Sequence, residues 1–450
     1  MSEKKAKPVK EDDLTSRIIA GLRAIAPKKA GGAHGLLEVG RSSKSVLAKV
    51  THVLMTGLSP FDDLTGAIPF GKVVEIYGLE NCGKTSLALK LAIQGQLKNI
   101  AEVTTNEAGH KVYTPIDHKD YDVSVLYLDN ESSLNDDEKT MVDGVAMDVA
   151  IARCDTVDMM FKVIERAIDE RDKKQKESTR QQLLIVIVDT VASTSSKEEL
   201  SQEWGKDDYS RQAKQLRRGF RILSRRISRS NVCAIFTNQV SDKFGDAGVK
   251  GRPKTVNPSE GNYDGFGGKA LRYYSTHRIF MFRLMSKYRV NRKSQFADGY
   301  LVGFYTTKNR LKKPCREGRL VLSFDEQRGG FNDNLSKLET LIYLKAAEVG
   351  ETGVEITFKF SRFGIEPKTF TPAKKSLDQE DDDEEASPTR RRRDPSIEGR
   401  MFWEKFYVEH RTDLDTLWQA AVQRAFADRQ TEPEPEVDDD NADESEEEED

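Results

Sequence analysis

Short apolar runs alternate with helix-forming stretches from residue 51 to residue 370. The clearest runs are rich in β-branched and aromatic residues, which predicts buried strands. These strands are Val73–Tyr77, Val123–Leu128, Leu183–Val188, Val232–Thr237, Arg278–Phe282 and Val302–Thr307. Strands that alternate with helices favour a mostly parallel sheet flanked by helices. The pattern therefore predicts an α/β core.

A further helical pattern lies on each side of this core. Between Leu14 and Ile25, apolar residues recur at helical spacing until the chain breaks at residues 28–32. So short an arm helix cannot bury its apolar stripe alone, and it packs either on its own core or on a neighbouring subunit; periodicity leaves both open. Between Leu414 and Phe426, apolar residues share one helix face, which predicts a small helical C-terminal module.

These patterns divide the chain into five regions. Residues 1–50 hold a disordered N-terminus and the arm helix, residues 51–370 the core, and residues 371–397 a charged linker. Residues 398–431 hold the helical module, and residues 432–450 form an acidic tail. The tail contains thirteen acids and no base, so we expect it to be disordered.

The net charge of −4 conceals a strong asymmetry. Because the tail holds thirteen of the acids, residues 1–431 carry +9, and a basic body with an acidic tail favours a polyanionic partner. The sequence has neither an apolar run of membrane-spanning length nor a signal-peptide core, so it predicts no membrane contact. The four cysteines lie far apart without metal-like spacing, which favours a reducing cytoplasm.

The segment Gly78–Thr85 fits the pattern Gly-x4-Gly-Lys-Thr between a predicted strand and a helix predicted over Thr85–Gln94. In such a loop the amides point at phosphates, Lys84 reaches the β and γ oxygens, and the Thr85 hydroxyl binds Mg²⁺. Cys82, at the helix N-terminus, is either activated toward thiolate or made inert by burial. The expected cofactors are ATP and Mg²⁺. The expected nucleotide-binding residues are Gly78, Leu79, Glu80, Asn81, Cys82, Gly83, Lys84, Thr85 and Ser86.

Carboxylates at the ends of two predicted strands would complete such a site. Asp189 ends the buried strand Leu183–Val188 and would hold the Mg²⁺. Asp129 and Glu131 follow Val123–Leu128, where one carboxylate would deprotonate the attacking water. Spacing alone does not choose between these two.

A basic helix and a long loop form a candidate DNA surface. From Gly205 to Ser230 the chain has nine Lys or Arg and two Asp, and its apolar residues step by three and four. One helix face is therefore buried and the other is nearly all positive. The loop from Val240 to Gly268 lacks periodicity, and its aromatics either stack on bases or tuck into the protein's own surface; the sequence leaves both open. The candidate DNA-binding residues are Lys214, Arg217, Arg218, Lys243, Phe244, Lys250, Arg252, Lys254, Phe266, Gly267, Gly268 and Lys269.

Several short motifs follow one another in an order that is far more specific than the phosphate loop alone. They are the lead-in segments Thr56–Ser59 and Gly71–Gly78, the strand end Phe236–Gln239, the segment Gly267–Tyr274, the triplet Lys308–Arg310, and the stretch Lys197–Leu223. Together they resemble the RecA family of DNA recombinases over roughly residues 14–345.

The resemblance implies a role for each matching residue. Glu131 becomes the catalytic carboxylate, and Asp189 becomes the acid beside magnesium. Gln239 becomes a sensor of the γ-phosphate that is coupled to the DNA-binding loop behind it. Lys308 and Arg310 become cations that act on the ATP of a neighbouring subunit. The arm helix then resembles the family's polymerisation arm, which favours packing on a neighbour.

The function implied by the resemblance is that of a DNA-dependent ATPase. It would form helical filaments on single-stranded DNA, pair that DNA with homologous duplex DNA and exchange strands. It would act in the cytoplasm on the nucleoid, with loader or single-strand-binding proteins as partners.

Two alternatives stay open. One is a hexameric replicative helicase, which shares the core. The other is a non-catalytic recombinase paralogue. Against it argue four retained residues: Lys84, Glu131, Asp189 and Gln239.

Several features depart from the family pattern. Arg310 stands where Lys is usual, and residues 132–138 lack the aromatic that commonly stacks on adenine. The loop before Gly267 is longer than usual, residues 98–122 resemble an insertion, and the C-terminal module has no clear match. These departures are typical of a divergent member, for example one encoded by a phage.

Overall fold

The computed structural model describes residues 50–105, 111–132, 134, 141–142, 144–196, 209–242, 263–290, 295–324, 330–351, 355–366 and 396–427. The predicted arm helix, the linker up to residue 395 and the acidic tail lie outside these ranges. Some candidate DNA-binding residues also lie outside them, namely Lys243, Phe244, Lys250, Arg252 and Lys254.

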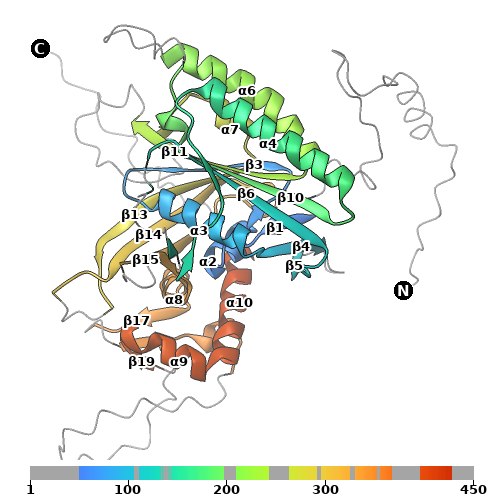
Figure 1. Cartoon of the computed structure of the whole chain (residues 1–450). Coiled ribbons are helices and arrows are strands. Elements are labelled where there is room, and N and C mark those ends of the chain that lie inside the picture. The colour runs from blue at the N-terminus through green and yellow to red at the C-terminus, as the bar shows by residue number, and fades with distance from the viewer. Residues whose placement is uncertain are drawn as a thin grey trace, which may run out of the picture.

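Within the described residues, a ten-stranded sheet forms the centre of the fold (Figure 1). Its strands lie in the order β16 (Gly330–Asn332), β15 (Glu317–Ser323), β14 (Gly299–Lys308), β13 (His277–Tyr288), β3 (Lys72–Gly78), β11 (Val232–Asp242), β10 (Gln181–Asp189), β6 (Tyr121–Asp129) and β9 (Ala150–Ala152). Neighbours from β13 to β9 are parallel, and those from β13 to β16 are antiparallel. The tenth strand of the sheet, β12 (Tyr263–Gly265), lies outside this order and pairs antiparallel with β11. All of the strands named from the sequence are present, so the predicted mostly parallel core is confirmed.

Helices cover both faces of this sheet (Figure 1). One face carries α2 (Ser59–Thr65), α3 (Lys84–Gln96) and α8 (Asp333–Tyr343); the other carries α4 (Val157–Glu177), α6 (Tyr209–Arg229) and α7 (Ala270–Tyr274). In β10, Leu183, Ile185 and Ile187 join the first core, and Leu184, Val186 and Val188 join the second. Because successive strand side chains point to opposite faces, a strand buried on both sides must be apolar throughout.

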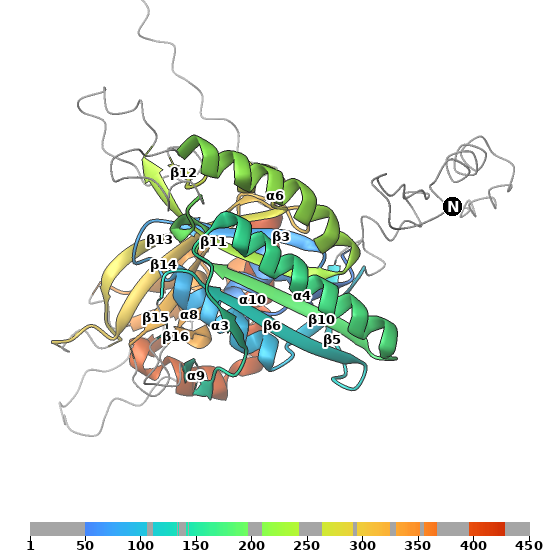
Figure 2. The same cartoon turned by 45° about the horizontal axis from the view of Figure 1, so that its top comes forward.

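Helices α4 and α6 lie side by side over the second core, as Figure 2 shows. The rings of Phe161 and Phe220 meet edge to face with centroids 5.2 Å apart. A Cβ at Gly219 would lie 2.1 Å from the Phe161 ring, so glycine at this position permits the close approach of the two helices. This packing holds the basic helix α6 firmly against the sheet.

Residues 98–122, which resemble an insertion, form a hairpin and the start of β6. The hairpin strands β4 (Ile100–Thr105) and β5 (Lys111–Pro115) join β1 (His52–Leu54) and β2 (Ile68–Pro69) in an antiparallel sheet. Buried Val53, Ala101 and Val103 give this sheet a small core of its own. The hairpin therefore braces the segment that leads into the phosphate loop. A separate two-stranded pair is formed by β7 (Met141–Val142) and β8 (Val145–Ala146).

The C-terminal module combines two helices with strands that the sequence does not predict. The helices are α9 (Trp403–Glu409) and α10 (Arg411–Ala427), and the strands are β17 (Ala347–Val349), β18 (Glu355–Phe358) and β19 (Ser396–Glu398). Short 3-10 turns lie at η2 (Val191–Ser193), η5 (Phe360–Phe363) and η6 (Arg400–Phe402). The indoles of Trp403 and Trp418 each donate at 2.6 Å, to the carbonyl oxygen of Asn334 and to the carboxylate of Asp63. These bonds dock the module on α8 and α2.

Candidate functional site

The carboxyl ends of four parallel strands meet at one edge of the sheet. Gln239 of β11 pairs in register with Gly78 of β3, and Asp189 of β10 pairs with Asp129 of β6. Glu131 follows β6 two residues later. The strand order β3-β11-β10-β6 therefore brings the loop after Gly78, the Gln239 side chain and the predicted carboxylates to the same edge.

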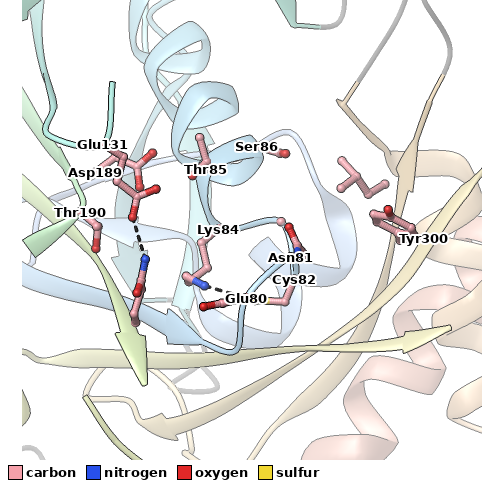
Figure 3. A pocket seen from close by; sticks show the side chains of 13 residues that line it. Glu80, Asn81, Cys82, Lys84, Thr85, Ser86, Glu131, Asp189, Thr190 and Tyr300 are labelled. Atoms are coloured by element: carbon pink, nitrogen blue, oxygen red, sulfur yellow. Dashed lines mark hydrogen bonds between the residues drawn. The ribbon is translucent and has the colours of Figure 1, made fainter. Parts of the chain in front are cut away.

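A cavity of about 370 Å³ opens at this edge (Figure 3), a volume in the range of small-ligand sites. The described residues that line it are Glu80, Asn81, Cys82, Gly83, Lys84, Thr85, Ser86, Glu131, Asp189, Thr190, Gln239, Tyr300 and Leu322. The sequence predicts most of this set. It misses Thr190, Tyr300 and Leu322.

The loop has a backbone that requires glycine at its two ends. A Cβ at Gly78 would lie 2.0 Å from the carbonyl oxygen of Met281 in β13. Gly83, directly before α3, has a φ of +85°, a conformation that glycine adopts without strain. The Lys84 Nζ donates to the carbonyl oxygens of Gly78 and Leu79 at 3.0 and 2.6 Å. The ammonium therefore lies folded across the loop, where a bound anion would compete with these two carbonyls for it.

Cys82 is a buried thiol. Its side chain is 1% exposed, and Sγ donates to the carbonyl oxygen of Leu79 at 2.9 Å. Burial raises the pKa of Cys82 and outweighs the opposing effect of the Lys84 charge. Of the two alternatives for this residue, the structure favours the inert thiol.

Two hydroxyl groups orient the Asp189 carboxylate. Tyr127 Oη donates to Oδ2 at 2.8 Å, and Thr237 Oγ1 donates to Oδ1. The next residue, Thr190, follows a cis peptide bond and donates its hydroxyl to the carbonyl oxygen of Thr237 at 2.9 Å. Although Asp189 is only 1% exposed, it lines the cavity and faces the loop (Figure 3). This is a suitable position for an acid that assists a metal bound at Thr85.

Glu131 and Gln239 contact each other across the cavity. Gln239 Nε2 donates to Glu131 Oε1 at 2.9 Å (Figure 3). Partial burial raises the pKa of Glu131, the charge of Asp189 raises it further, and the bond from Gln239 lowers it. Asp129 instead accepts the backbone N–H of Leu134 at 3.1 Å and does not line the cavity. Of the two candidate carboxylates, Asp129 at the end of β6 and Glu131 just beyond it, Glu131 is the one that faces the loop.

A buried polar group lies directly behind Gln239. Asn238 Nδ2 donates to Glu75 Oε1 at 3.2 Å and to the carbonyl oxygen of Phe266 at 3.1 Å. Glu75, only 1% exposed, forms an ion pair with Arg278 Nε. The Arg278 guanidinium lies over the Tyr77 ring, 4.3 Å from its centroid. The strand end that faces the cavity is thus bonded to the segment that closes the candidate DNA loop.

Lys308 and Arg310 lie away from this chain's own cavity. Lys308 Nζ donates to the carbonyl oxygens of Arg272 and Tyr273 at 3.1 and 3.3 Å. Asn309, buried between the two cations, donates to the carbonyl oxygen of Thr65 at 2.6 Å and so fixes the turn. Neither cation lines the cavity. Within one chain, they are not placed to touch its nucleotide.

The described DNA candidates gather on and beside α6. Lys214, Arg217 and Arg218 are exposed, while Leu216, Phe220, Leu223 and Ile227 are buried beneath them, so the predicted division of the helix into two faces is present. A Cβ at Gly267 would lie 2.4 Å from Leu216, and one at Gly268 would lie 3.4 Å from Ala213. Gly267 and Gly268 therefore pack against α6, with exposed Lys269 beside them.

Where the structure describes the chain, none of its helices is long and apolar enough to cross a membrane.

Comparisons with known proteins agree with one another. The family model for the RecA N-terminal domain matches residues 119–328. Protein RecA of Chlamydia trachomatis is 25% identical over 302 residues, which cover 66% of this chain and 71% of that protein. Protein RecA of Methylobacterium radiotolerans is 27% identical over 363 residues, covering 79% and 83%. Protein RecA of Thermus aquaticus is 28% identical over 259 residues, covering 58% and 62%.

Proposed function

Because this chain is a divergent member of the RecA family, we propose that it is an ATP-dependent recombinase that forms filaments on single-stranded DNA and catalyses homologous pairing and strand exchange. The observation that carries the proposal is the position of β11. Its Gln239 is bonded to Glu131 in the cavity, and its Asn238 is bonded to Phe266 at the end of the candidate DNA loop. In this proposal, one strand end would connect a nucleotide site with a DNA site.

The residues present suit ATP and Mg²⁺. Bound ATP supplies the γ-phosphoryl group, and Mg²⁺ neutralises charge on its β and γ oxygens. In the part of the chain that the structure describes, no three His, Cys, Asp or Glu side chains are grouped to hold a metal by themselves. That fits an ion held largely by phosphate and water, with Thr85 and Asp189 as the protein's contribution. The loop amides, the α3 N-terminus and Lys84 would hold the phosphates.

Glu131 would act as the general base. Burial and the Asp189 charge raise its pKa, which makes it a better proton acceptor than an exposed glutamate. The amide of Gln239 donates to one oxygen of this base. With a terminal phosphate in reach, Gln239 would have a second acceptor, and the Glu131 oxygen could accept a proton from water. The same movement of Gln239 would be passed through Asn238 to Phe266.

Lys308 and Arg310 would act on the nucleotide of a neighbouring subunit. Lys308 ends β14 and pairs with Arg278 of β13, and Arg310 follows two residues later; neither residue lines its own chain's cavity. Cations supplied across a subunit boundary would make hydrolysis depend on assembly, as arginine fingers do in other nucleotide hydrolases.

The test combines electron microscopy with a joint-molecule assay, using single-stranded DNA and homologous duplex with ATP. We expect open helical filaments and exchanged strands from the wild type, and neither from Lys84→Ala. Heterologous duplex is the control, because sequence is read by base pairing and the protein holds mainly the backbone. Closed rings that unwind duplex would replace the recombinase proposal with a helicase. Filaments without strand exchange at any magnesium concentration would indicate a non-catalytic paralogue.

A further inference from the structure

The nucleotide cavity has two ends of different chemistry. Figure 3 shows Glu131, Asp189 and Thr190 on one side of the loop and Tyr300 on the opposite side, with Lys84, Thr85 and Ser86 between them. A nucleoside phosphate whose terminal phosphate faces Glu131 and whose other phosphates lie over the loop must extend its base toward the far side. That side is where Tyr300 stands.

An aromatic side chain at this end of the cavity would offer a stacking surface to a base. The segment Ser132–Glu138, which follows the catalytic carboxylate, contains no aromatic residue. Among the described residues that line the cavity, Tyr300 is the one aromatic. Base–aromatic stacking is a substantial source of affinity and tolerates different bases, because every base has a π face.

Sheet pairing places Tyr300 and Leu322 together on one face. The two residues are register partners between β14 and β15, so their side chains lie on the same side of the sheet. A Cβ at Gly83 would lie 3.5 Å from Leu322 and 3.0 Å from Phe331. The β14–β15–β16 edge is therefore in contact with the phosphate loop, and Tyr300 keeps a fixed distance from it.

The Tyr300 ring is also oriented in advance of binding. Phe324 meets it edge to face, with centroids 4.6 Å apart and an interplanar angle of 88°. The Arg283 guanidinium lies over the ring, 5.2 Å from its centroid. An aromatic ring held by an edge contact and a cation loses little conformational freedom when a base stacks on it.

We propose that Tyr300 is the nucleobase platform of this chain and that it stacks on the base of a bound purine nucleotide. The inference rests on the proposed nucleotide function and adds the means of base recognition. Stacking discriminates by the size of the π surface, so purine diphosphates should bind more tightly than pyrimidine diphosphates.

Affinities of the full-length protein for ADP, UDP and tripolyphosphate, each with Mg²⁺, test the proposal. Tyr300→Ala should weaken ADP roughly 5- to 150-fold, bring it close to UDP, and leave tripolyphosphate unchanged. Tyr300→Phe should bind ADP as the wild type does. Tyr343→Ala, which removes a partly exposed tyrosine that does not line the cavity, is the matched control and should change nothing.

The outcomes distinguish the role of Tyr300 from the nucleotide site itself. If Tyr300→Ala binds ADP like the wild type, or loses ADP and tripolyphosphate equally, Tyr300 is not the platform and the phosphate site stands. If wild-type protein binds neither ADP nor tripolyphosphate, the proposed nucleotide function is overturned, and the role of Tyr300 with it.

Discussion

The ion pair between Glu75 and Arg278 is the most exacting electrostatic feature behind the site. The Glu75 side chain is 1% exposed and the Arg278 side chain is 10% exposed, so water does little to stabilise either charge. Glu75→Gln keeps the shape and one oxygen for Asn238, and it removes the negative charge that faces the buried Arg278 guanidinium. Breaking a buried pair from one side costs about 3–5 kcal/mol.

The expected effect is large enough to measure without ambiguity. At about 2–4 °C per kcal/mol for a sizeable domain, the midpoint of thermal unfolding should fall by roughly 10 °C. Urea unfolding should show a lower midpoint with an unchanged slope. The matched control is Glu170→Gln, whose partner Arg166 is 2.7 Å away and whose side chain is 51% exposed. That change should cost less than about 1 kcal/mol.

A double variant separates the loss of charge from the loss of packing. Glu75→Leu with Arg278→Met removes both charges and retains volume, so it should recover most of the lost stability. The reasoning is refuted if Glu75→Gln is no more harmful than Glu170→Gln, or if the double variant is less stable than Glu75→Gln alone.

Three further predictions concern pH, assembly and acid stability. Burial and the charge of Asp189 raise the pKa of Glu131, so the acid limb of the pH profile of kcat should lie at a higher pH than for an ordinary glutamate. Glu131→Gln should hydrolyse ATP at least about 10²-fold more slowly and lose this limb. An unchanged limb in that variant would assign the titration to another group. A Lys308→Ala/Arg310→Ala protein should be inactive alone and regain ATPase activity when mixed with Lys84→Ala at hybrid interfaces; no recovery at any ratio would count against action in trans. Burial lowers the pKa of His277 to about 3, so the folded state resists a proton that the unfolded chain accepts below about 6.5. As the pH falls from 7 to 5, this residue should lower the free energy of unfolding by about 2 kcal/mol. In urea titrations, the free energy of unfolding of His277→Gln should depend less on pH over this range.

The parts of the site that depend on local spacing could be predicted from the sequence. The phosphate loop is one continuous segment, and Asp189 ends an apolar run that only a doubly buried strand explains. Asp129 and Glu131 could not be separated in this way, because the choice depends on how the chain turns after β6. The backbone N–H of Leu134 turns Asp129 away, and the amide of Gln239 meets Glu131.

The sequence could not predict features that depend on pairing between distant segments of the chain. Tyr300 reaches the cavity through its register with Leu322 and through the contact of β15 and β16 with the loop, and no motif encodes that pairing. The strand β19 pairs with β18 across the charged linker, and its three residues carry no strand signal of their own. Nonlocal contacts of this kind follow from the assembled fold.

If β11 joins a nucleotide site to a DNA site, ATP turnover should depend on single-stranded DNA, which a rate measurement with and without that DNA will reveal. Wild-type protein should hydrolyse ATP slowly alone and many-fold faster with single-stranded DNA. Asn238→Ala removes the side-chain bonds to Phe266 and Glu75 but leaves Gln239 and Glu131 in place, so it should keep the slow rate and lose most of the stimulation. Equal wild-type turnover with and without DNA, or full stimulation in Asn238→Ala, would contradict the account.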